Sequence, residues 1–349
     1  MHEKPSIPDE QLRACLQDQY SLSAAMLEFL PLGMDTRSAL YRVVSEQGTS
    51  YLLKIRSGPF YVPSCRVPRY LRDQGIASVV APLPTKRKTL WTQMGDWKMT
   101  VYPFIAGDTS WTPAMTDEQW RAVGTTFHQI HQIRLPPGGF AGLRKETFDA
   151  TEYSRWVHVF DTQFAGSRGA SQAEQALRSC WMAHRTTIHT AVTSLEALAY
   201  RLQGRSGSQV ICHADLHPGN LIRDQAGNVF VIDWEDVMVA LKERDFLFVE
   251  GAPVEAATRQ ATSPFFQGYE QTEIDWMALT YYLWERAVQD LIVSAQIVVD
   301  RDDVGEATKA DELRVFRDTL AEGGMVDEAH AAAAHLPSDL SWHTEDVSR

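Results

Sequence analysis

The segment from His213 to Glu235 carries acidic and amide side chains at a spacing suited to phosphoryl transfer. It reads HADLHPGNLIRDQAGNVFVIDWE. Moving the γ-phosphoryl group of ATP to an alcohol requires a carboxylate that orients the alcohol and accepts its proton, together with oxygen ligands for magnesium. Asp215 is followed five residues later by Asn220, which is the H-x-D-x-x-x-x-N spacing of a kinase catalytic loop. The spacing predicts that Asp215 is the catalytic base and Asn220 a magnesium ligand.

A second aspartate completes the pattern. Asp233 closes the apolar run Val229–Ile232 eighteen residues after Asp215, where kinases place the magnesium-binding aspartate of D-F-G. Each piece alone is common at a turn or a strand end, but the combination, with Pro218-Gly219 forcing a turn between its parts, is improbable by chance. We therefore expect Asp233 to bind Mg²⁺ and the chain to use ATP as phosphoryl donor.

The segment resembles the aminoglycoside phosphotransferase family, whose loop reads H-x-D-x-H-x-x-N, and the chain is most similar to its spectinomycin phosphotransferase branch. The likeness extends over most of the chain, and its motifs include Gly58-Pro59-Phe60, Tyr102-Pro103-Phe104-Ile105, Lys242-Glu243-Arg244-Asp245 and Tyr281-Tyr282. The resemblance implies an α+β, bilobal protein-kinase-like fold. It would have an N-terminal nucleotide-binding lobe over residues 1–104 and a catalytic, substrate-binding lobe over 105–349.

The resemblance also assigns roles to single residues. Lys54 would hold the α- and β-phosphates, and the backbone of Tyr102, Pro103, Phe104 and Ile105 would form the hinge that hydrogen-bonds adenine. His217 would lie near the γ-phosphate, although a purely structural imidazole is an equal alternative. His213 is expected to brace the loop by hydrogen bonds. Apart from the resemblance, the surplus of acids between Asp215 and Glu250 could line a pocket for ammonium groups, or several of them could be solvated surface acids. The substrate-side candidates named on this basis are Glu235, Arg244 and Asp290.

One expected residue is missing. In kinases a glutamate on the helix after the lysine strand holds the lysine toward the phosphates, but between Lys54 and Val80 the only acid is Asp73. Val62 stands where the resemblance leads us to expect the glutamate. Either another acid, such as Asp35 or Asp233, orients Lys54 when ATP binds, or the enzyme is a poor or altered kinase.

Apolar periodicity indicates which elements position these residues. An N-terminal antiparallel sheet of about five strands is expected from the runs at 28–32, 39–44, 51–55, 78–83, 90–91 and 99–104, with helices at 9–20 and 66–74. A mostly helical C-terminal lobe is expected from helical spacing after Thr116, which opens a capping box, and at 150–161, 171–203, 243–249, 255–270 and 273–297. Short strands at 209–212 and 229–232 flank the polar motif. The tail beyond about Asp300 can add a further helix, and Pro337 to Arg349 is expected to fray.

Charge and composition limit the choice of partner. The 349 residues include 33 basic and 45 acidic side chains, for a formal net charge of −12. This balance argues against nucleic acid or anionic membranes and favours cationic small molecules. Four scattered cysteines, and an N-terminus without a signal-like apolar core, favour a cytoplasmic protein.

The leading functional prediction is ATP- and Mg²⁺-dependent phosphorylation of a hydroxyl on an aminocyclitol or aminoglycoside antibiotic, with spectinomycin as the first acceptor and resistance as the outcome. A metabolic kinase for choline, an amino alcohol or a sugar amine would share the same loop. A catalytically weak protein that binds nucleotide or antibiotic is the third reading, motivated by the missing glutamate. The sequence leaves the oligomeric state open.

Overall fold

Strand-forming and helix-forming segments gather in different parts of this computed structural model, which describes residues 4–33, 37–109, 114–166, 171–205, 207–302 and 304–337. The chain divides into two units. Unit 1 comprises Met1–Lys145, Val210–Val239 and Pro264–Glu270, and unit 2 comprises Glu146–Gln209, Ala240–Ser263 and Gln271–Arg349. The 213–235 motif therefore belongs with the N-terminal residues. The lobe boundary at 104/105 is not tested by this division and stays a prediction.

Unit 1 is built on a five-stranded sheet. Its strands are β1 (Ala24–Leu30), β2 (Ser38–Ser45), β3 (Ser50–Ser57), β4 (Thr92–Met94) and β5 (Trp97–Pro103), in the antiparallel order β1-β2-β3-β5-β4. This confirms the predicted N-terminal antiparallel sheet. Successive side chains point to opposite faces of a strand, so Leu53 and Ile55 are fully buried on one face while Lys54 and Arg56 lie on the other.

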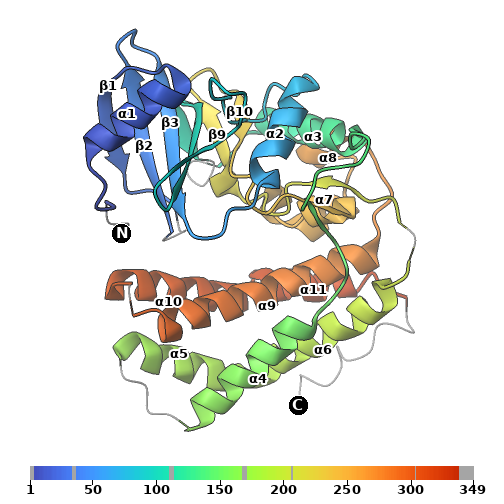
Figure 1. Cartoon of the computed structure of the whole chain (residues 1–349). Helices are drawn as coiled ribbons and strands as arrows, with labels where there is room; N and C mark the ends of the chain where they lie inside the picture. Colours follow the sequence, from blue (N-terminus) through green and yellow to red (C-terminus); the bar gives the residue numbers. More distant parts are fainter. Residues whose placement is uncertain are drawn as a thin grey trace. The chain divides into compact units, whose positions relative to one another are not determined.

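The buried face of the sheet packs against helix α1 (Asp9–Tyr20), which matches the predicted helix and crosses the strands in Figure 1. Leu12 and Leu16 of α1 are fully buried in the same apolar cluster as Tyr41 and Val101. Burial of side chains of this size stabilises by about 1.5–3 kcal/mol each. The hydrophobic effect thus fixes one face of the sheet and leaves the Lys54 face for polar residues.

The segment expected as a strand at 78–83 is the clearest error of the sequence analysis. Only an isolated bridge between Val79 and Val231 forms there. Pro82 lies within the expected strand and Pro84 just after it, and since proline lacks a backbone N–H it cannot extend a hydrogen-bonded ladder. The bridge still has a role, because Val80 N–H donates to Val231 O (3.0 Å) and Val231 N–H to Ser78 O (2.8 Å).

The polar motif lies beside two small sheets of unit 1. One has the order β10-β9-β6, from β6 (Gly107–Thr109), β9 (Leu221–Asp224) and β10 (Val229–Val231); the other has the order β7-β11-β8, from β7 (Arg144–Lys145), β8 (Val210–Cys212) and β11 (Met238–Ala240). The 3₁₀ turn η1 (Pro218–Asn220) leads into β9. The predicted short strands at 209–212 and 229–232 are therefore present, with β9 added between them.

Helix α3 (Asp117–Gln132) begins at the predicted capping box, in which the Thr116 hydroxyl accepts from Gln119 N–H and the Gln119 side chain accepts from Thr116 N–H. It packs closely against α8 (Pro264–Tyr269), and two glycines permit the approach. A Cβ on Gly124 would lie 2.0 Å from the carbonyl oxygen of Phe265, and one on Gly268 would lie 2.0 Å from that of Arg121. Helix α2 (Pro63–Asp73) begins three residues before its predicted start.

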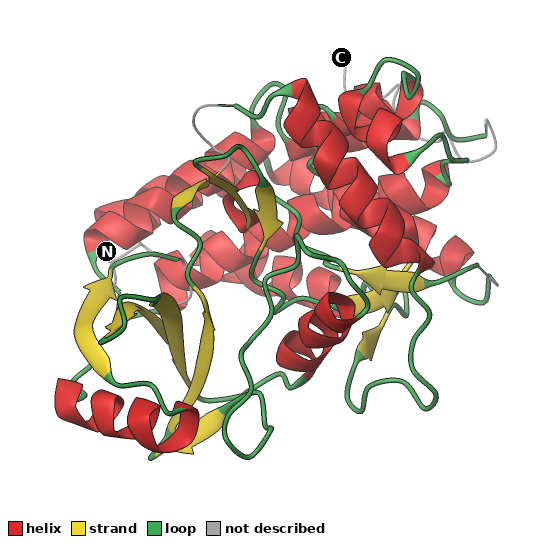
Figure 2. Cartoon of the chain, turned by 90° about the horizontal axis from the view of Figure 1, so that it is seen from above, coloured by secondary structure: helices red, strands yellow, loops and turns green. Residues whose placement is uncertain are grey.

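Unit 2 is helical, as Figure 2 shows by colour. Its α-helices are α4 (Thr151–Gly166), α5 (Gln172–Ala183), α6 (Arg185–Leu202), α7 (Pro253–Thr258), α9 (Trp276–Asp300), α10 (Glu306–Leu320) and α11 (Met325–Ala333), and its 3₁₀ turns are η2 (Lys242–Asp245) and η3 (Val249–Gly251). The single helices expected at 171–203 and 255–270 are each two helices. The first breaks at His184, and prolines begin both α7 and α8, in keeping with the preference of proline for a first helical turn.

Helices α9, α10 and α11 lie together in one layer of unit 2 (Figure 1). They extend the described chain to Pro337, so the tail beyond Asp300 does add helix. Residues 338–349, where fraying was expected, lie outside the described residues. No helix within the described ranges is long and apolar enough to cross a membrane.

A buried carboxylate ties three helices of unit 2 together. Asp161 of α4 has a side chain that is 7% exposed, and it accepts hydrogen bonds from Trp181 Nε1 of α5 (2.9 Å), Arg185 Nη2 of α6 (3.1 Å) and His189 Nε2 of α6 (2.5 Å). Burial alone raises the pKa of Asp161, but these hydrogen bonds outweigh it and hold the pKa below its usual value.

Replacing Gly124 with alanine tests the α3–α8 approach. We expect G124A to lower the free energy of unfolding by about 1–3 kcal/mol, because the added methyl group forces the helix backbones apart. Chemical denaturation measures the change. Gly166, where an added Cβ meets nothing within 4 Å, gives the control G166A, expected within about 0.5 kcal/mol of the parent. Equal stability of the two variants would refute the close packing.

The Asp161 cluster predicts that the free energy of unfolding depends on pH. The pKa of Asp161 is depressed in the folded state, so its stabilisation is present above the unfolded pKa of about 3.9 and is lost as the pH falls through the folded pKa. We expect D161N to cost about 1.5–3 kcal/mol at pH 7, with the difference from the parent shrinking below about pH 4. Denaturation at both pH values measures this. The exposed Asp311, paired with Arg314, supplies the control D311N, and a D161N deficit independent of pH would contradict the assignment.

Candidate active site

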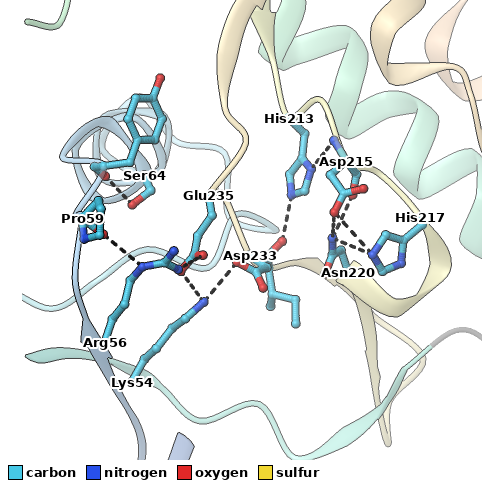
Figure 3. A network of polar contacts seen from close by, with 12 residues as sticks. Lys54, Arg56, Pro59, Ser64, His213, Asp215, His217, Asn220, Asp233 and Glu235 are labelled. Atoms are coloured by element: carbon cyan, nitrogen blue, oxygen red, sulfur yellow. Dashed lines mark hydrogen bonds and ion pairs between the residues drawn. The ribbon is translucent and has the colours of Figure 1, made fainter. Parts of the chain in front are cut away.

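The polar face of β3 presents Lys54 to two carboxylates of the 213–235 motif. Lys54 Nζ lies 2.6 Å from Glu235 Oε1 and 3.2 Å from Asp233 Oδ1 (Figure 3). The lysine side chain is 17% exposed, whereas those of Asp233 and Glu235 are 43% and 32% exposed. A half-buried ammonium requires such partners, because burial without compensation costs several kcal/mol.

The charge of Lys54 is secured by this pairing. Burial lowers the pKa of Lys54. Attraction to Asp233 and Glu235 and hydrogen bonds to both raise it by more than burial lowers it, so the net pKa lies above the usual lysine value. The lysine is therefore fully protonated at neutral pH. Of the two acids that the sequence suggested as partners, Asp233 is in contact; Asp35 lies outside the described residues.

Arg56 adds a second cation to the same face, since it follows Lys54 by two positions on β3. Its Nη1 lies 2.5 Å from Glu235 Oε2, and its Nε donates to Pro59 O at 3.2 Å. Glu235 thus contacts Lys54 with one oxygen and Arg56 with the other. The structure places this substrate-side candidate next to Lys54, and its function stays a prediction.

The catalytic-loop residues form a second cluster around Asp215. Asn220 Nδ2 donates to Asp215 O (2.8 Å) and to Asp215 Oδ2 (3.2 Å). His217 Nδ1 accepts from Gly219 N–H (3.0 Å), and its Nε2 lies 3.5 Å from Asp215 Oδ2 and 3.2 Å from Asn220 Nδ2. The Asp215 carboxylate is therefore held by an amide and an imidazole in the geometry drawn in Figure 3.

His213 joins the two clusters through the backbone. It is fully buried, its Nε2 donates to Ile232 O at 2.8 Å, and its Nδ1 accepts from Asp215 N–H at 3.3 Å. Ala214 and Asp233, which flank these bonds, have positive φ angles of 70° and 57°, a conformation that costs a non-glycine residue about 1–2 kcal/mol. The loop-bracing hydrogen bonds expected of His213 are present and hold this strained backbone.

Asn220 and Asp233 offer oxygen ligands of the kind that magnesium prefers. Ile232 N–H donates to Asn220 O at 3.0 Å, which brings the two segments side by side. Because Asn220 Nδ2 donates to Asp215, Oδ1 is the ligand atom that this amide can offer. An amide oxygen and a partly exposed carboxylate fit a magnesium ion.

The expected hinge begins at the end of β5. Burial, the Cys65 thiol, Asp233 and Glu235 together raise the pKa of Tyr102 well above its usual value, so its hydroxyl belongs to the Lys54 environment. Phe104 N–H donates to Ser50 O at 3.4 Å, and the Arg42 guanidinium lies 4.9 Å from the Phe104 ring centroid. The described contacts do not test the adenine-binding role of Tyr102, Pro103, Phe104 and Ile105.

The other two substrate-side candidates belong to unit 2. Arg244 pairs with Glu285, which also accepts from Tyr153 (3.2 Å) and Tyr281 (3.3 Å). Asp290 pairs with Arg286 Nε at 2.9 Å. Both have ion-pair partners within their own unit, and their substrate role stays a prediction. The aromatic residues Trp234, Tyr281, Tyr282 and Trp284 are core residues, at most 3% exposed.

Sequence reasoning missed several residues that hold the site. Arg56 was detectable, because i and i+2 on a strand share a face. Tyr61 and Arg144 were not: the Tyr61 hydroxyl donates to Val237 O (2.8 Å), and Arg144 Nη2 donates to Glu235 O (2.6 Å). These bonds join positions far apart in the chain, and no spacing rule signals them.

A strand lysine paired with a carboxylate after a short strand, beside an Asp–Asn catalytic loop, defines a kinase-like phosphotransferase. Residues 28–282 match the model of the phosphotransferase enzyme family, so the chain belongs to that family. The match spans both halves of the motif and the whole of the N-terminal sheet except its first residues. No match was found among curated protein sequences.

Solved structures agree with this assignment. A spectinomycin phosphotransferase in complex with ADP and spectinomycin is 27% identical, with a TM-score of 0.84, over 94% of this chain and 99% of that one. An amicoumacin kinase bound to AMP-PNP, Ca²⁺ and its ligand has 18% identity and a TM-score of 0.60, over 92% and 94% of the two chains. A microcompartment-associated aminopropanol kinase has 16% identity and a TM-score of 0.57, over 91% and 99%. The last two share the fold with this chain.

The bracing role of His213 is testable. We expect H213A to lower the free energy of unfolding by about 2–4 kcal/mol, because two buried hydrogen bonds and the contact with the Trp234 ring (4.7 Å between centroids) are lost. Turnover is expected to fall about tenfold as Asp215 loses its fixed position. Denaturation and a phosphoryl-transfer assay measure the two effects. The exposed His158 gives the control H158A, and parental behaviour of H213A in both assays would contradict the role.

Proposed function

We propose that this protein transfers the γ-phosphoryl group of ATP, with Mg²⁺, to a hydroxyl of a cationic aminocyclitol or aminoglycoside, with spectinomycin as the first acceptor to test. The main support is that unit 1 contains both the Lys54–Asp233 ion pair and the Asp215–Asn220 hydrogen bond. The similarity to a spectinomycin phosphotransferase supports this choice of acceptor. Resistance to that antibiotic would follow from its phosphorylation.

Each residue has a definite task in this reaction. Asp215 orients the acceptor hydroxyl and takes its proton as the oxygen attacks phosphorus, with Asn220 and His217 fixing the carboxylate. Lys54 binds the non-transferred phosphates. Asp233 and Asn220 would hold magnesium, which when bound would neutralise charge on the phosphate oxygens. The hinge from Tyr102 to Ile105 binds adenine.

Two observations help to choose between an antibiotic kinase, an amino-alcohol kinase and a non-catalytic binding protein. The missing helix glutamate suggested a weak or non-catalytic relative, but the carboxylates beside Lys54 supply the anionic partner that catalysis needs, which favours an active enzyme. The net charge of −12 favours a cationic acceptor but suits amino alcohols as well as aminocyclitols. The choice of acceptor therefore depends on assay.

The decisive assay measures ADP release with ATP and Mg²⁺ over a panel of aminocyclitols, aminoglycosides, choline and amino alcohols. We expect spectinomycin to support turnover and to gain one phosphate by mass spectrometry. D215N should lower kcat at least about a thousandfold while nucleotide affinity stays within about threefold, because Asp215 contributes to proton transfer and alignment rather than to nucleotide binding. Expression in a spectinomycin-sensitive host should raise the inhibitory concentration only for the parent.

Turnover of amino alcohols alone would reassign the protein to the metabolic kinases. Absence of turnover over the whole panel, with nucleotide still bound, would favour the binding protein. Full activity of D215N would refute the proposed base.

A further inference from the structure

The acid that positions Lys54 comes from an unexpected part of the chain. Helix α2 carries no acid in its first turn, and its Asp73 pairs with Arg69 at the opposite end. What α2 brings near Lys54 is the thiol of Cys65: the lysine lowers the pKa of that thiol, although burial dominates and the net pKa is raised. Within its described residues, α2 therefore offers no first-turn carboxylate of the kind that holds the lysine in kinases.

We infer that Glu235, clamped by Arg56, replaces the helix glutamate as the residue that positions Lys54 for the phosphates. This inference rests on the proposed function and assigns Glu235 and Arg56 as positioning residues. The contact of Lys54 with Glu235 (2.6 Å) is shorter than that with Asp233 (3.2 Å). A carboxylate between two cations also keeps its orientation better than one held by a single flexible lysine.

The distinction between the two carboxylates matters once magnesium binds. Asp233 is the residue that would ligate the metal, and a carboxylate oxygen facing Mg²⁺ is a weaker partner for an ammonium. Glu235 contacts Lys54 independently of that site and continues to orient it. Without Glu235, Lys54 and Mg²⁺ would compete for Asp233.

The surroundings of Glu235 are built to fix it. Its carbonyl oxygen accepts from Arg144 Nη2 (2.6 Å), and Arg144 also contacts Asp236 Oδ1 (3.2 Å). The Tyr61 hydroxyl donates to Val237 O (2.8 Å) and accepts from Arg144 N–H (2.9 Å). Arg56 itself is tied to Pro59 O (3.2 Å). The backbone and the side chain of Glu235 are therefore held by separate contacts within unit 1.

A double-mutant cycle tests the arrangement, with E235Q, R56M and the combination of both. Binding of the non-hydrolysable ATP analogue AMP-PNP is measured by calorimetry over a range of Mg²⁺ concentrations, and kcat is measured with the acceptor found above. We expect E235Q to weaken analogue affinity about tenfold and R56M about threefold. The double variant should match E235Q within about twofold, because Arg56 acts through Glu235.

The Mg²⁺ concentration needed for half-maximal analogue binding is a second measurement. It would not change if Glu235 only stabilised the fold. We expect E235Q to need several-fold more Mg²⁺ for half-maximal analogue binding, since Lys54 then competes for Asp233. R56K should recover part of the affinity lost in R56M. R69M, which breaks the Arg69–Asp73 pair at the far end of α2, is the matched control and should behave as the parent in both titrations.

The outcomes separate this inference from the proposed function. Parental affinity and parental Mg²⁺ dependence in E235Q, or multiplied losses in the double variant, would overturn the inference even if the parent phosphorylates an acceptor. Weakened, Mg²⁺-sensitive binding in E235Q would support it even if no acceptor in the panel is turned over. Thermal melting confirms that each variant is folded. If E235Q melts below the assay temperature, E235D replaces it, because this variant keeps the charge on a shorter side chain. E235D should lose less affinity for the analogue than E235Q and show a smaller increase in the Mg²⁺ requirement.

Discussion

The site in unit 1 depends on the need to compensate a half-buried ammonium group. Lys54 projects from a sheet whose opposite face is fixed by apolar packing, so the lysine is held on the polar face of the sheet. The positive charge of Lys54 must therefore be compensated by carboxylates on the polar face of the sheet. Asp233 and Glu235 compensate the charge, and Asp233 does so from a backbone conformation with a positive φ angle of 57°.

The supporting contacts follow from that constraint. A left-handed aspartate persists only where its surroundings over-determine it, and here the buried His213 bonds to Ile232 O while the parallel bridge at Val79 holds Val231. The same His213 accepts from Asp215 N–H. One imidazole therefore joins the strand end that faces Lys54 to the loop that carries the proposed base.

The pairing also suggests how a phosphotransferase tolerates the loss of a familiar residue. What the chemistry needs is a carboxylate in a fixed place beside the lysine, and the element that supplies it is of secondary importance. In this chain the helix supplies a thiol, while the segment after Asp233 supplies an acid and β3 supplies an arginine to hold it. The electrostatic requirement is met by a different set of contacts.

The sequence alone determined much of this protein, because its signals are local. The capping box fixed the start of α3, and the spacing of Asp215, Asn220 and Asp233 predicted the phosphotransferase chemistry that the family match supports. The failures were local as well: prolines after Val79 removed a strand that apolar content favoured.

Only the tertiary structure decided which acid faces Lys54. Glu235 looked like a substrate ligand in the sequence, and Arg56, Tyr61 and Arg144 carried no motif at all. Their contacts join residues separated by up to 181 positions, as for Lys54 and Glu235. Such pairings are set by how the sheet, the helix and the motif pack together. Sequence periodicity describes one element at a time, so it predicts which side chains share a face but not which distant charge will meet them.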